Sequence, residues 1–474
     1  MKKTKIICTI GPASQEIETI KKLVKAGMNG ARLNFSHGTY EQFEMIIKNL
    51  RKVSESLKVP IAIIQDLQGP KIRIGKMPDE GLPVKKGEKI ILSTKIKEYE
   101  EQKGIKVIPL QYKKLPKDIK LDDNILIDDG KIELDAYKVN LLKTEIHCTV
   151  KNNGTLFSNK GLNAPKTNLS IEAMSKKDLQ DLEFGLAQDV DYIALSFVRS
   201  AKDIEKLRDK LKEAKRYQTK IIAKIERPEA MENLTAIIEA SDAVMVARGD
   251  LGIEIPAELV PIAQKRIIRE ANRQGKPVIT ATHVLNSMVE NPLPTRAEIS
   301  DAANAVFDST DAIMLSNETA VGLYPVEACQ TINDVATAIE TEINKHNLKE
   351  KIISTVELET IDAICNSAVT LAHDIKAKYI VTLSKSGFTA GQIGKNRSDT
   401  EIIVFTSKPK TRNQMAIYWG IENVYIEEDL DYKDPVEIVR NRLVKEKLAR
   451  KKDEIVVVNA VRGSKERLIT TFEV

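Results

Sequence analysis

The sequence predicts an α/β protein: an eight-stranded β/α barrel with an inserted all-β cap domain and a C-terminal α/β domain. Three observations predict this fold. Short β-rich runs alternate with amphipathic helical stretches, and eight of these runs can be counted before residue 347. Between residues 75 and 167 the alternation stops and turn-rich short strands replace it. From about residue 357 the alternation starts again.

The eight barrel strands are predicted from short runs of apolar and β-branched residues, most of them followed by a segment with helical periodicity. Three of them come before the insertion and five after it. They occupy residues 5–10, 30–35, 60–66, 192–197, 220–226, 243–250, 277–282 and 311–316. A long helix from residue 325 to about residue 347 is expected to lead out of the barrel.

The inserted segment is rich in turn signals, such as the Asp-Asp-Gly-Lys sequence at residues 128–131, and has few helical patterns. We therefore expect four parts of the chain. They are the first part of the barrel at 1–74, a β-rich lid at 75–167, the second part of the barrel with its exit helix at 168–347, and an α/β domain at 348–474. The last part has five predicted strands with helices between them, which favours a doubly wound or mixed sheet.

Composition excludes several classes of protein. A net charge of +5 over 474 residues, with basic and acidic residues interleaved, does not indicate nucleic-acid binding. The four cysteines are far apart and form no Cys-x-x-Cys pair, which argues against a zinc site or disulfides and fits a reducing cytoplasm. No apolar stretch approaches the roughly 18 residues that a membrane helix needs.

The segment 220–255 is the centre of the predicted site. It consists of two apolar runs that end in carboxylates, joined by a helix-like stretch at residues 228–240. A right-handed crossover places such strands side by side, so Glu226 and Asp250 should emerge at the same end of one sheet. Lys224 lies two residues before Glu226 and therefore points to the same face.

Two carboxylates and a lysine at strand ends suit Mg2+ with a phosphate beside it. For a lone Lys-x-Glu sequence, a salt bridge facing solvent is the more common structure. The glycines on either side of Asp250, Gly249 and Gly252, favour a binding site because they let backbone N–H groups approach a ligand closely.

Active sites of β/α barrels lie at the carboxyl ends of the strands. Seven of the eight predicted strands end in ionisable or hydroxyl side chains, which predicts a polar pocket for an anion and a metal. Those residues are Arg32, Asn34, Ser36, His37, Asp66, Ser196, Lys224, Glu226, Arg248, Asp250, Thr280, Thr282, His283, Ser316 and Glu318.

Five motifs resemble those of the pyruvate kinase family. They are Ala-Arg-Leu-Asn-Phe-Ser-His-Gly at 31–38, Lys-Ile-Glu at 224–226, the run Met-Val-Ala-Arg-Gly-Asp-Leu-Gly-Ile-Glu-Ile-Pro at 245–256, Pro-Thr-Arg-Ala-Glu at 294–298 and Ile-Met-Leu-Ser-Asn-Glu-Thr-Ala at 313–320. The resemblance extends over essentially the whole chain. It implies phosphoryl transfer between phosphoenolpyruvate and ADP to give pyruvate and ATP in glycolysis, in a cytoplasmic homotetramer that does not bind nucleic acid or membranes.

The resemblance also implies roles for individual residues. Mg2+, or Mn2+ in its place, would be held by Glu226 and Asp250. The residues implied in catalysis and substrate binding are Lys224 for the phosphoryl group in flight, Arg32 for the phosphate, Gly249 and Asp250 for the substrate carboxylate, and Thr282 for the proton-donating water. The residues implied in nucleotide binding are Asn34, Ser36, His37, Arg73 and Lys160.

One departure from the family pattern concerns K+. Many members have a glutamate where this chain has Lys71, although residues resembling the K+ ligands are present. These are Asn34, Ser36, Asp66 and Leu67. Because a lysine ammonium carries the same unit charge as K+, we hypothesise that Lys71 fills the monovalent-cation site and that K+, although it could bind, is dispensable. The alternative is that Lys71 points to solvent and K+ still binds.

A second phosphate site is predicted in the C-terminal domain. A loop with hydroxyls, a lysine and a glycine precedes a helix, and its predicted effector ligands are Ser384, Lys385, Ser386 and Thr389. Such a sequence alone is more often a helix cap. Its resemblance to the family's effector loop implies regulation by a sugar phosphate or nucleotide, although the basic segment 461–467 lacks the family's longer loop with its tryptophan.

Two other functions remain open from the residues alone. One is a Mg2+-dependent lyase that cleaves 2-oxoacids on a similar barrel, which would need neither a cap domain nor a second phosphate site. The other is a non-catalytic sensor that uses only the C-terminal loop, against which the intact set of Lys224, Glu226, Asp250 and Thr282 argues.

Overall fold

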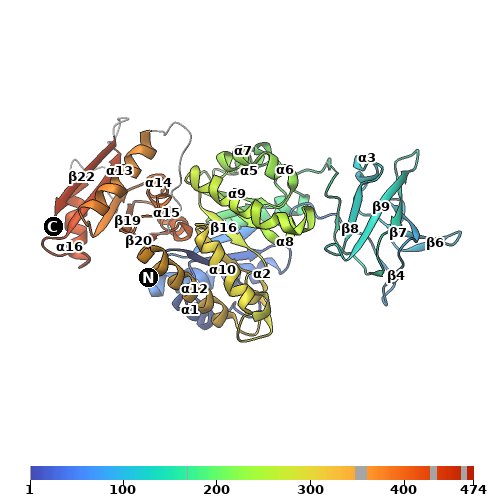
Figure 1. The fold of residues 1–474 in the computed structure, drawn as a ribbon, viewed down its shortest axis with the longest axis horizontal. Coiled ribbons are helices and arrows are strands. Elements are labelled where there is room, and N and C mark those ends of the chain that lie inside the picture. The colour runs from blue at the N-terminus through green and yellow to red at the C-terminus, as the bar shows by residue number, and fades with distance from the viewer. Residues whose placement is uncertain (1, 168, 347–359, 428–434, 461–466) are drawn as a thin grey trace.

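The computed structural model describes residues 2–167, 169–346, 360–427, 435–460 and 467–474. Three bodies lie in a row, with the barrel in the middle, the inserted β-rich lid at one end and the C-terminal domain at the other (Figure 1). The expected boundary between residues 167 and 168 involves residue 168, and the boundary at 347–348 falls within 347–359. Both positions lie outside the described residues.

Eight parallel strands form a closed barrel in the order β1, β17, β16, β15, β14, β13, β3, β2, which confirms the predicted fold. These strands are apolar along nearly their whole length because helices cover the outer face and side chains fill the interior. Their bounds are β1 Lys5–Thr9, β2 Gly30–Asn34, β3 Ala62–Asp66, β13 Tyr192–Leu195, β14 Lys220–Ile225, β15 Ala243–Ala247, β16 Val278–Ala281 and β17 Ala312–Leu315.

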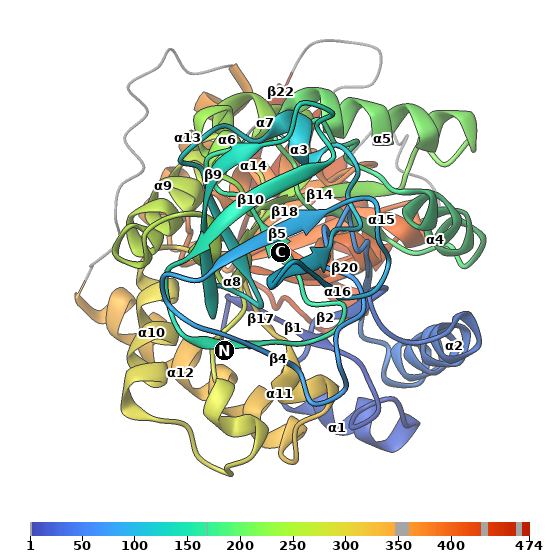
Figure 2. The same cartoon turned by 90° about the vertical axis from the view of Figure 1, so that its right-hand side faces the viewer.

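Helices follow the strands around the barrel (Figure 2). They are α1 Ile17–Lys25, α2 Tyr40–Leu57, α4 Lys176–Ala187, α5 Ala201–Glu213, α6 Pro228–Glu232, α7 Leu234–Ala240, α8 Arg248–Glu254, α9 Val260–Arg273, α10 Arg296–Phe307, α11 Asn317–Ala320 and α12 Pro325–His346. Ser175 and Thr295 begin α4 and α10 with capping boxes, in which a hydroxyl and an acidic side chain satisfy the first free N–H groups.

Two details differ from the sequence prediction. The stretch expected as one helix at 228–240 is two helices that meet at Asn233. The sixth strand ends at Ala247, and the residues from Arg248 form the short helix α8 rather than a continuation of the strand. Asp250 therefore lies in the first turn of a helix, where the positive end of the helix dipole favours a carboxylate.

The lid contains a seven-stranded sheet in the order β12, β8, β9, β10, β5, β7, β6 and a separate pair of strands, β11 and β4. Its alternating apolar residues bury their own core. Its elements are β4 Leu82–Val84, β5 Lys89–Ser93, β6 Glu100–Gln102, β7 Ile105–Pro109, α3 Leu115–Asp118, β8 Asn124–Ile127, β9 Ile132–Val139, β10 Glu145–Val150, β11 Gly154–Leu156 and β12 Leu162–Asn163.

The C-terminal domain has a five-stranded sheet in the order β20, β19, β18, β21, β22, in which only β22 is antiparallel. It is the mixed sheet that the sequence allowed. Its elements are α13 Thr360–Asp374, β18 Tyr379–Leu383, α14 Phe388–Gly394, β19 Glu401–Thr406, α15 Pro409–Gln414, β20 Ile421–Ile426, α16 Pro435–Lys445, β21 Glu454–Ala460 and β22 Arg467–Glu473.

A buried arginine joins this domain to the barrel. Arg397 lies 3.0 Å from Asp311 and 2.8 Å from the Asn272 amide oxygen, and its guanidinium lies over the ring of Trp419. Among the described helices, none is both long enough and apolar enough to cross a membrane.

Candidate active site

Lys224 is surrounded by oxygen atoms at the carboxyl end of β14. Its Nζ lies 2.8 Å from Glu226 Oε1 and 3.3 Å from Asp66 Oδ1, and it donates a hydrogen bond of 2.7 Å to the Ser196 hydroxyl. Burial disfavours the ammonium, but the charges of Asp66, Glu226 and Asp250 outweigh that cost and raise the pKa of Lys224 above its ordinary value. Lys224 is therefore a fixed positive charge at neutral pH.

Asp66 connects Lys224 to Arg32. Its Oδ2 accepts a hydrogen bond of 2.7 Å from Arg32 Nε, while its other oxygen faces Lys224. Burial opposes ionisation of Asp66, yet the charges of Lys224 and Arg32 prevail and lower its pKa. Arg32 also donates a hydrogen bond of 3.1 Å to the Thr9 hydroxyl. Its guanidinium is therefore held from both sides of β2, by Thr9 on β1 and Asp66 on β3. Two cations thus lie side by side around one carboxylate.

Asp250 is close enough to Glu226 for its charge to act on that carboxyl group. Burial raises the pKa of Glu226, and the negative charge of Asp250 raises it further, whereas Lys224 opposes the shift. The N–H of Phe197, a residue with a φ of 55°, donates to Glu226 Oε2 at 2.7 Å. Two acidic groups in this position favour the binding of a cation in addition to Lys224.

The donor set fits Mg2+. Within the described ranges, no three His, Cys, Asp or Glu side chains gather as a ready-made metal cage. Mg2+ is commonly held by only one or two carboxylates, with water and substrate oxygens completing its octahedron. Glu226 and Asp250 supply such a pair. The hard carboxylate oxygens also suit Mn2+.

Thr282 is held in a strained backbone conformation. Its φ is 64° and that of His283 is 52°, values that a β-branched residue rarely adopts. Arg248 stabilises this turn, because its guanidinium donates to the Thr282 carbonyl at 2.8 Å and is anchored by Asp301 at 2.7 Å. The Thr282 hydroxyl accepts a hydrogen bond of 2.7 Å from the N–H of Gly249. A ligand that binds this N–H must therefore displace the hydroxyl.

The glycines beside Asp250 are not required by their backbone angles, since neither has a positive φ. A Cβ atom at Gly249 would lie 3.4 Å from the Thr282 hydroxyl, and one at Gly252 would lie 3.6 Å from Val260. Both are ordinary van der Waals contacts. What Gly249 provides is an N–H at the start of α8, beside Asp250, and the partner of this N–H is the Thr282 hydroxyl.

The expected monovalent-cation residues come from neighbouring strands. Asn34 and Asp66 are paired in register on β2 and β3, and the Asn34 amide oxygen accepts from the Ser36 N–H at 3.2 Å. The carbonyl of Leu67 accepts from the Ser196 hydroxyl at 2.7 Å. The Lys71 side chain is exposed and forms no ion pair within the described part of the chain.

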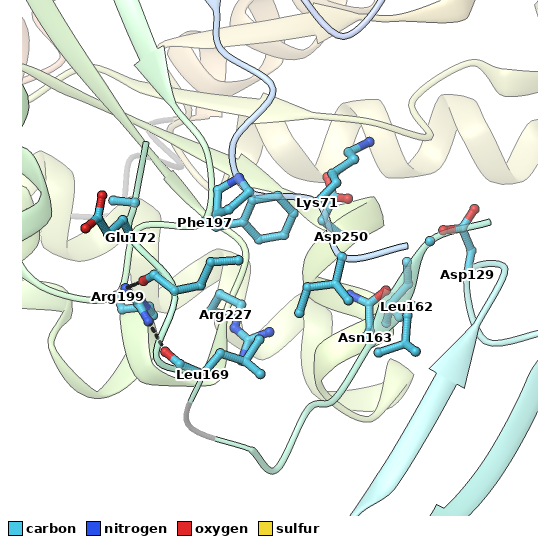
Figure 3. A pocket seen from close by; sticks show the side chains of 16 residues that line it. Lys71, Asp129, Leu162, Asn163, Leu169, Glu172, Phe197, Arg199, Arg227 and Asp250 are labelled. Carbon is cyan, nitrogen blue, oxygen red and sulfur yellow. Dashed lines mark hydrogen bonds between the residues drawn. The ribbon is translucent and has the colours of Figure 1, made fainter. Parts of the chain in front are cut away.

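Beside the cluster of Lys224, Glu226 and Asp250, a cavity that is partly open to solvent lies between the barrel and the lid (Figure 3). Asp250, Phe197 and Lys71 line it from the barrel, and Asp129 and Asn163 line it from the lid. Its lining therefore includes the proposed metal ligand Asp250 as well as residues of the lid.

Of the expected nucleotide residues, Arg73 and Lys160 lie at the connection between the barrel and the lid, whereas Asn34, Ser36 and the exposed His37 lie at the end of β2. Arg73 forms an isolated β-bridge with Gly161, which brings it next to Lys160, and it donates to the Asn159 carbonyl at 3.0 Å. Lys160 lies 3.0 Å from Asp128. The structure thus brings Arg73 and Lys160 together, although they are far apart in the sequence.

Three polar residues expected at the rim have structural partners instead. The Thr280 hydroxyl bonds to Thr310 at 2.9 Å, and Arg248 clamps the Thr282 turn. Glu318 accepts from the N–H of Leu285 at 3.0 Å, and its other oxygen accepts from the N–H of Ser316. Thr280 points away from the pocket because alternate residues of a strand face opposite sides, whereas Arg248 and Glu318 lie in the short helices α8 and α11 and bond to nearby turns.

Sequence reasoning did not assign a role to several residues that contact the site. Ser196 was among the polar strand ends without a role of its own, and its hydroxyl accepts a hydrogen bond from Lys224. Arg227 and Glu254 carry no such signal, because their 3.0 Å ion pair depends on how α8 packs beside β14.

The predicted effector loop is compact. The Ser384 hydroxyl accepts from the N–H of Gly387 at 3.0 Å, and Gly387 has a φ of 83° that a side chain would strain. Lys385 and Ser386 are exposed, and Thr389 is half-buried in the first turn of α14. Most of the basic segment expected opposite this loop, residues 461–466, lies outside the described residues.

Comparison with known proteins identifies the family. The model "Pyruvate kinase, barrel domain" matches residues 1–329, and "Pyruvate kinase, alpha/beta domain" matches residues 362–471. The chain is 43% identical over 424 residues to pyruvate kinases of two Staphylococcus aureus strains, USA300 and NCTC 8325, covering 90% of this chain and 72% of each relative. The chain superimposes on a crystal structure of a pyruvate kinase from Cryptosporidium parvum with a TM-score of 0.90 and 34% identity. The match covers 100% of this chain and 96% of the Cryptosporidium parvum chain. The chain therefore belongs to the pyruvate kinase family of phosphotransferases.

Proposed function

We propose that this protein transfers the phosphoryl group of phosphoenolpyruvate to ADP, giving pyruvate and ATP in glycolysis in the cytoplasm. The observation that carries the proposal is Lys224, a buried ammonium held 2.8 Å from Glu226 and 3.3 Å from Asp66 beside Arg32. Phosphoryl transfer proceeds through a loose transition state that needs positioned positive charge and little covalent chemistry. This group of residues supplies such charge.

In this mechanism Arg32 binds the phosphate, and the Gly249 and Asp250 N–H groups receive the substrate carboxylate after the Thr282 hydroxyl turns away. The bond between phosphorus and the enol oxygen breaks, and an ADP oxygen takes up the phosphoryl group. Lys224 stabilises both the group in flight and the enolate oxygen left behind. Mg2+, held by Glu226 and Asp250, would add further charge stabilisation there.

The enolate carbon then takes a proton from a water that Thr282 orients. The position of this hydroxyl supports the role, because it lies within hydrogen-bond distance of the Gly249 N–H that would face the substrate. Arg73 and Lys160, brought together beside the lid, would bind the nucleotide phosphates, with Asn34, Ser36 and His37 at its other side.

Mixing the protein with phosphoenolpyruvate, ADP and Mg2+ and measuring pyruvate tests this function directly. Pyruvate and ATP should appear in equal amounts. A 2-oxoacid lyase would instead release pyruvate from a 2-oxoacid without ADP, and a sensor would release none. Either of those results would contradict the proposal. A homotetramer, as the family resemblance suggests, is expected on sizing.

We expect activity without K+, because Lys71 carries a positive charge at the edge of the cleft. Its side chain is exposed, so its ammonium must swing towards Asp66 and Asn34 when substrate binds. Assays in Tris or Na+ buffers should give close to full turnover. Lys71→Glu should lower turnover about tenfold in the absence of K+. Turnover of this variant should recover when K+ is added, since K+ would then restore the lost positive charge.

The matched control for this charge reversal is Lys76→Glu, at an exposed lysine paired with Glu98 on the lid. It should leave the K+ response unchanged. A wild-type protein that is active only after K+ is added would refute the proposal, and the alternative in which Lys71 faces solvent would stand.

Allosteric regulation through the loop of Ser384, Lys385, Ser386 and Thr389 is supported by its hydroxyls and lysine around the turn at Gly387. Rates can be titrated with fructose 1,6-bisphosphate, ribose 5-phosphate and AMP. At least one of these compounds should lower the phosphoenolpyruvate concentration that gives the half-maximal rate. Ser384→Ala should abolish the response while leaving the basal rate unchanged. If none of the three compounds changes the rate curve, the domain is structural.

A further inference from the structure

One carboxylate oxygen joins three parts of the molecule beside the cavity. Glu254 is the last residue of α8, and its side chain is 1% exposed. Its Oε1 accepts a hydrogen bond of 2.7 Å from the Asn163 amide and lies 3.0 Å from Arg227 Nη1. Its Oε2 is buried and has no hydrogen-bond partner among the described residues. The bonds that hold this side chain therefore converge on one atom.

Arg227 is fully occupied by protein groups. Its side chain is 4% exposed, and besides Glu254 it contacts Glu229 at 3.2 Å and the Thr167 carbonyl at 3.4 Å. A guanidinium with its donors shared between two carboxylates and a carbonyl has a defined orientation. Arg227 thus acts as a rigid connection rather than a mobile surface charge.

The ion pair between Arg227 and Glu254 joins the two segments that contain the proposed metal ligands. Arg227 directly follows Glu226 in the chain, at the end of β14. Glu254 lies four residues after Asp250, one turn further along α8. The 3.0 Å ion pair between Arg227 and Glu254 therefore helps to set the distance between the segments that carry Glu226 and Asp250.

The same oxygen is bound to the lid. Asn163 belongs to β12, which pairs with β8 at Leu126 in the lid sheet. Thr167, whose carbonyl contacts Arg227, lies at the end of the lid segment and bonds to Asp123 within the lid. Both Asn163 and Arg227 line the cavity between lid and barrel (Figure 3). A movement of the lid must stretch or break these bonds.

We propose that Glu254 and Arg227 are positioning residues that couple the lid to the divalent-cation site. While Asn163 is bound, Oε1 of Glu254 is held and the spacing of Glu226 and Asp250 suits the cation. When the lid moves away, Glu254 loses one of its two partners and α8 is less restrained. Because coupling is reciprocal, cation binding also stabilises the attached position of the lid. The inference rests on the proposed metal role of Glu226 and Asp250.

Direct binding of Mn2+, measured by electron paramagnetic resonance on the full-length protein, tests this coupling without an activity assay. Asn163→Ala removes only the bond from the lid, and Asn163 is not a proposed metal ligand. Its Mn2+ dissociation constant should rise about fivefold to tenfold. The matched control is Asn152→Ala, whose amide bonds to Lys131 and Glu133 stay within the lid and should leave Mn2+ binding unchanged.

Glu254→Gln keeps the shape of the side chain and removes its charge, and it should weaken Mn2+ binding about tenfold or more, as loss of groups that orient metal ligands does. Adding Asn163→Ala to Glu254→Ala should cause little further loss, because Glu254→Ala already removes the oxygen that Asn163 binds. Hydrogen exchange of residues 162–167 should slow when Mn2+ binds to wild type. In Asn163→Ala this slowing should shrink.

Mn2+ binding by Asn163→Ala that equals wild type, or effects of Asn163→Ala and Glu254→Ala that simply add, would overturn the coupling. Glu226→Gln separates this result from failure of the metal site itself. If Glu226→Gln loses Mn2+ binding while Asn163→Ala does not, only the coupling is wrong. If Glu226→Gln binds Mn2+ like wild type, the proposed metal site is wrong and the coupling falls with it.

Discussion

Lys224→Met should lower turnover at least about a hundredfold, corresponding to roughly 2.7 kcal/mol of lost transition-state stabilisation. A unit charge about 4 Å from the transferred group is worth about 4 kcal/mol at an effective dielectric of 20, so a hundredfold is a conservative expectation. Methionine preserves most of the volume and removes the charge. Steady-state rates at saturating phosphoenolpyruvate, ADP and Mg2+ measure the effect.

The matched control for this substitution is Lys220→Met, at the other end of the same strand. Lys220 contacts the Tyr418 hydroxyl at 3.0 Å and lies over that ring, far from the carboxylates at the end of β14. It should retain nearly wild-type turnover. Thermal unfolding of both variants shows whether loss of activity reflects loss of fold, since Lys224→Met leaves Asp66 and Glu226 buried with less compensation. Wild-type turnover in a folded Lys224→Met would refute the role of this lysine.

Glu226→Gln should raise the Mg2+ concentration needed for half-maximal activity by about a hundredfold or more. It removes one of the two negative charges that face the proposed ion, and the charge count of the ligands largely sets affinity for a hard cation. The amide keeps the shape of the side chain and can still accept the hydrogen bond from the Phe197 N–H, which the carboxylate accepts at 2.7 Å. Rates measured over a range of Mg2+ concentrations, at fixed substrate, give the comparison.

Glu232→Gln provides the control for this second variant. Glu232 is exposed at the end of α6, a few residues along the chain from Glu226. Its neutralisation should leave the Mg2+ dependence within about twofold of wild type, because an exposed charge is screened by water and salt. An unchanged Mg2+ dependence in Glu226→Gln would show that the ion, if bound, is held elsewhere.

The fold could be predicted almost completely from the sequence because its signals are local. Each barrel strand is a short buried run such as Lys5–Thr9 or Ala312–Leu315, and each is followed by periodic apolar residues or by the turn-rich insertion. The errors are local as well. The sequence from Ala243 to Asp250 has no breaker before the glycine, so the strand was extended over residues that form the first turn of α8.

The site could be predicted only in part. Lys224 and Glu226 lie two residues apart at a strand end, and their 2.8 Å contact follows from that spacing. The contact of Asp66 with both Lys224 and Arg32 joins β3 to its neighbour β2 and to β14, which is distant in sequence, and it depends on the order of strands in the barrel. Lys71 shows the limit most clearly, since the hypothesis from the sequence places its ammonium in the monovalent-cation site, whereas its side chain is exposed in the structure.

The sequence by itself determined which groups this protein carries and at which strand ends they emerge, because periodicity and turn residues act over a few positions. Tertiary structure alone decided which groups from separate segments of the chain meet. Thr280 and Glu318 are turned to structural partners, whereas Arg227 and Glu254 form an ion pair against the lid. The physical reason is that contacts between separate segments depend on how helices and domains pack around the barrel, and no local pattern encodes that packing.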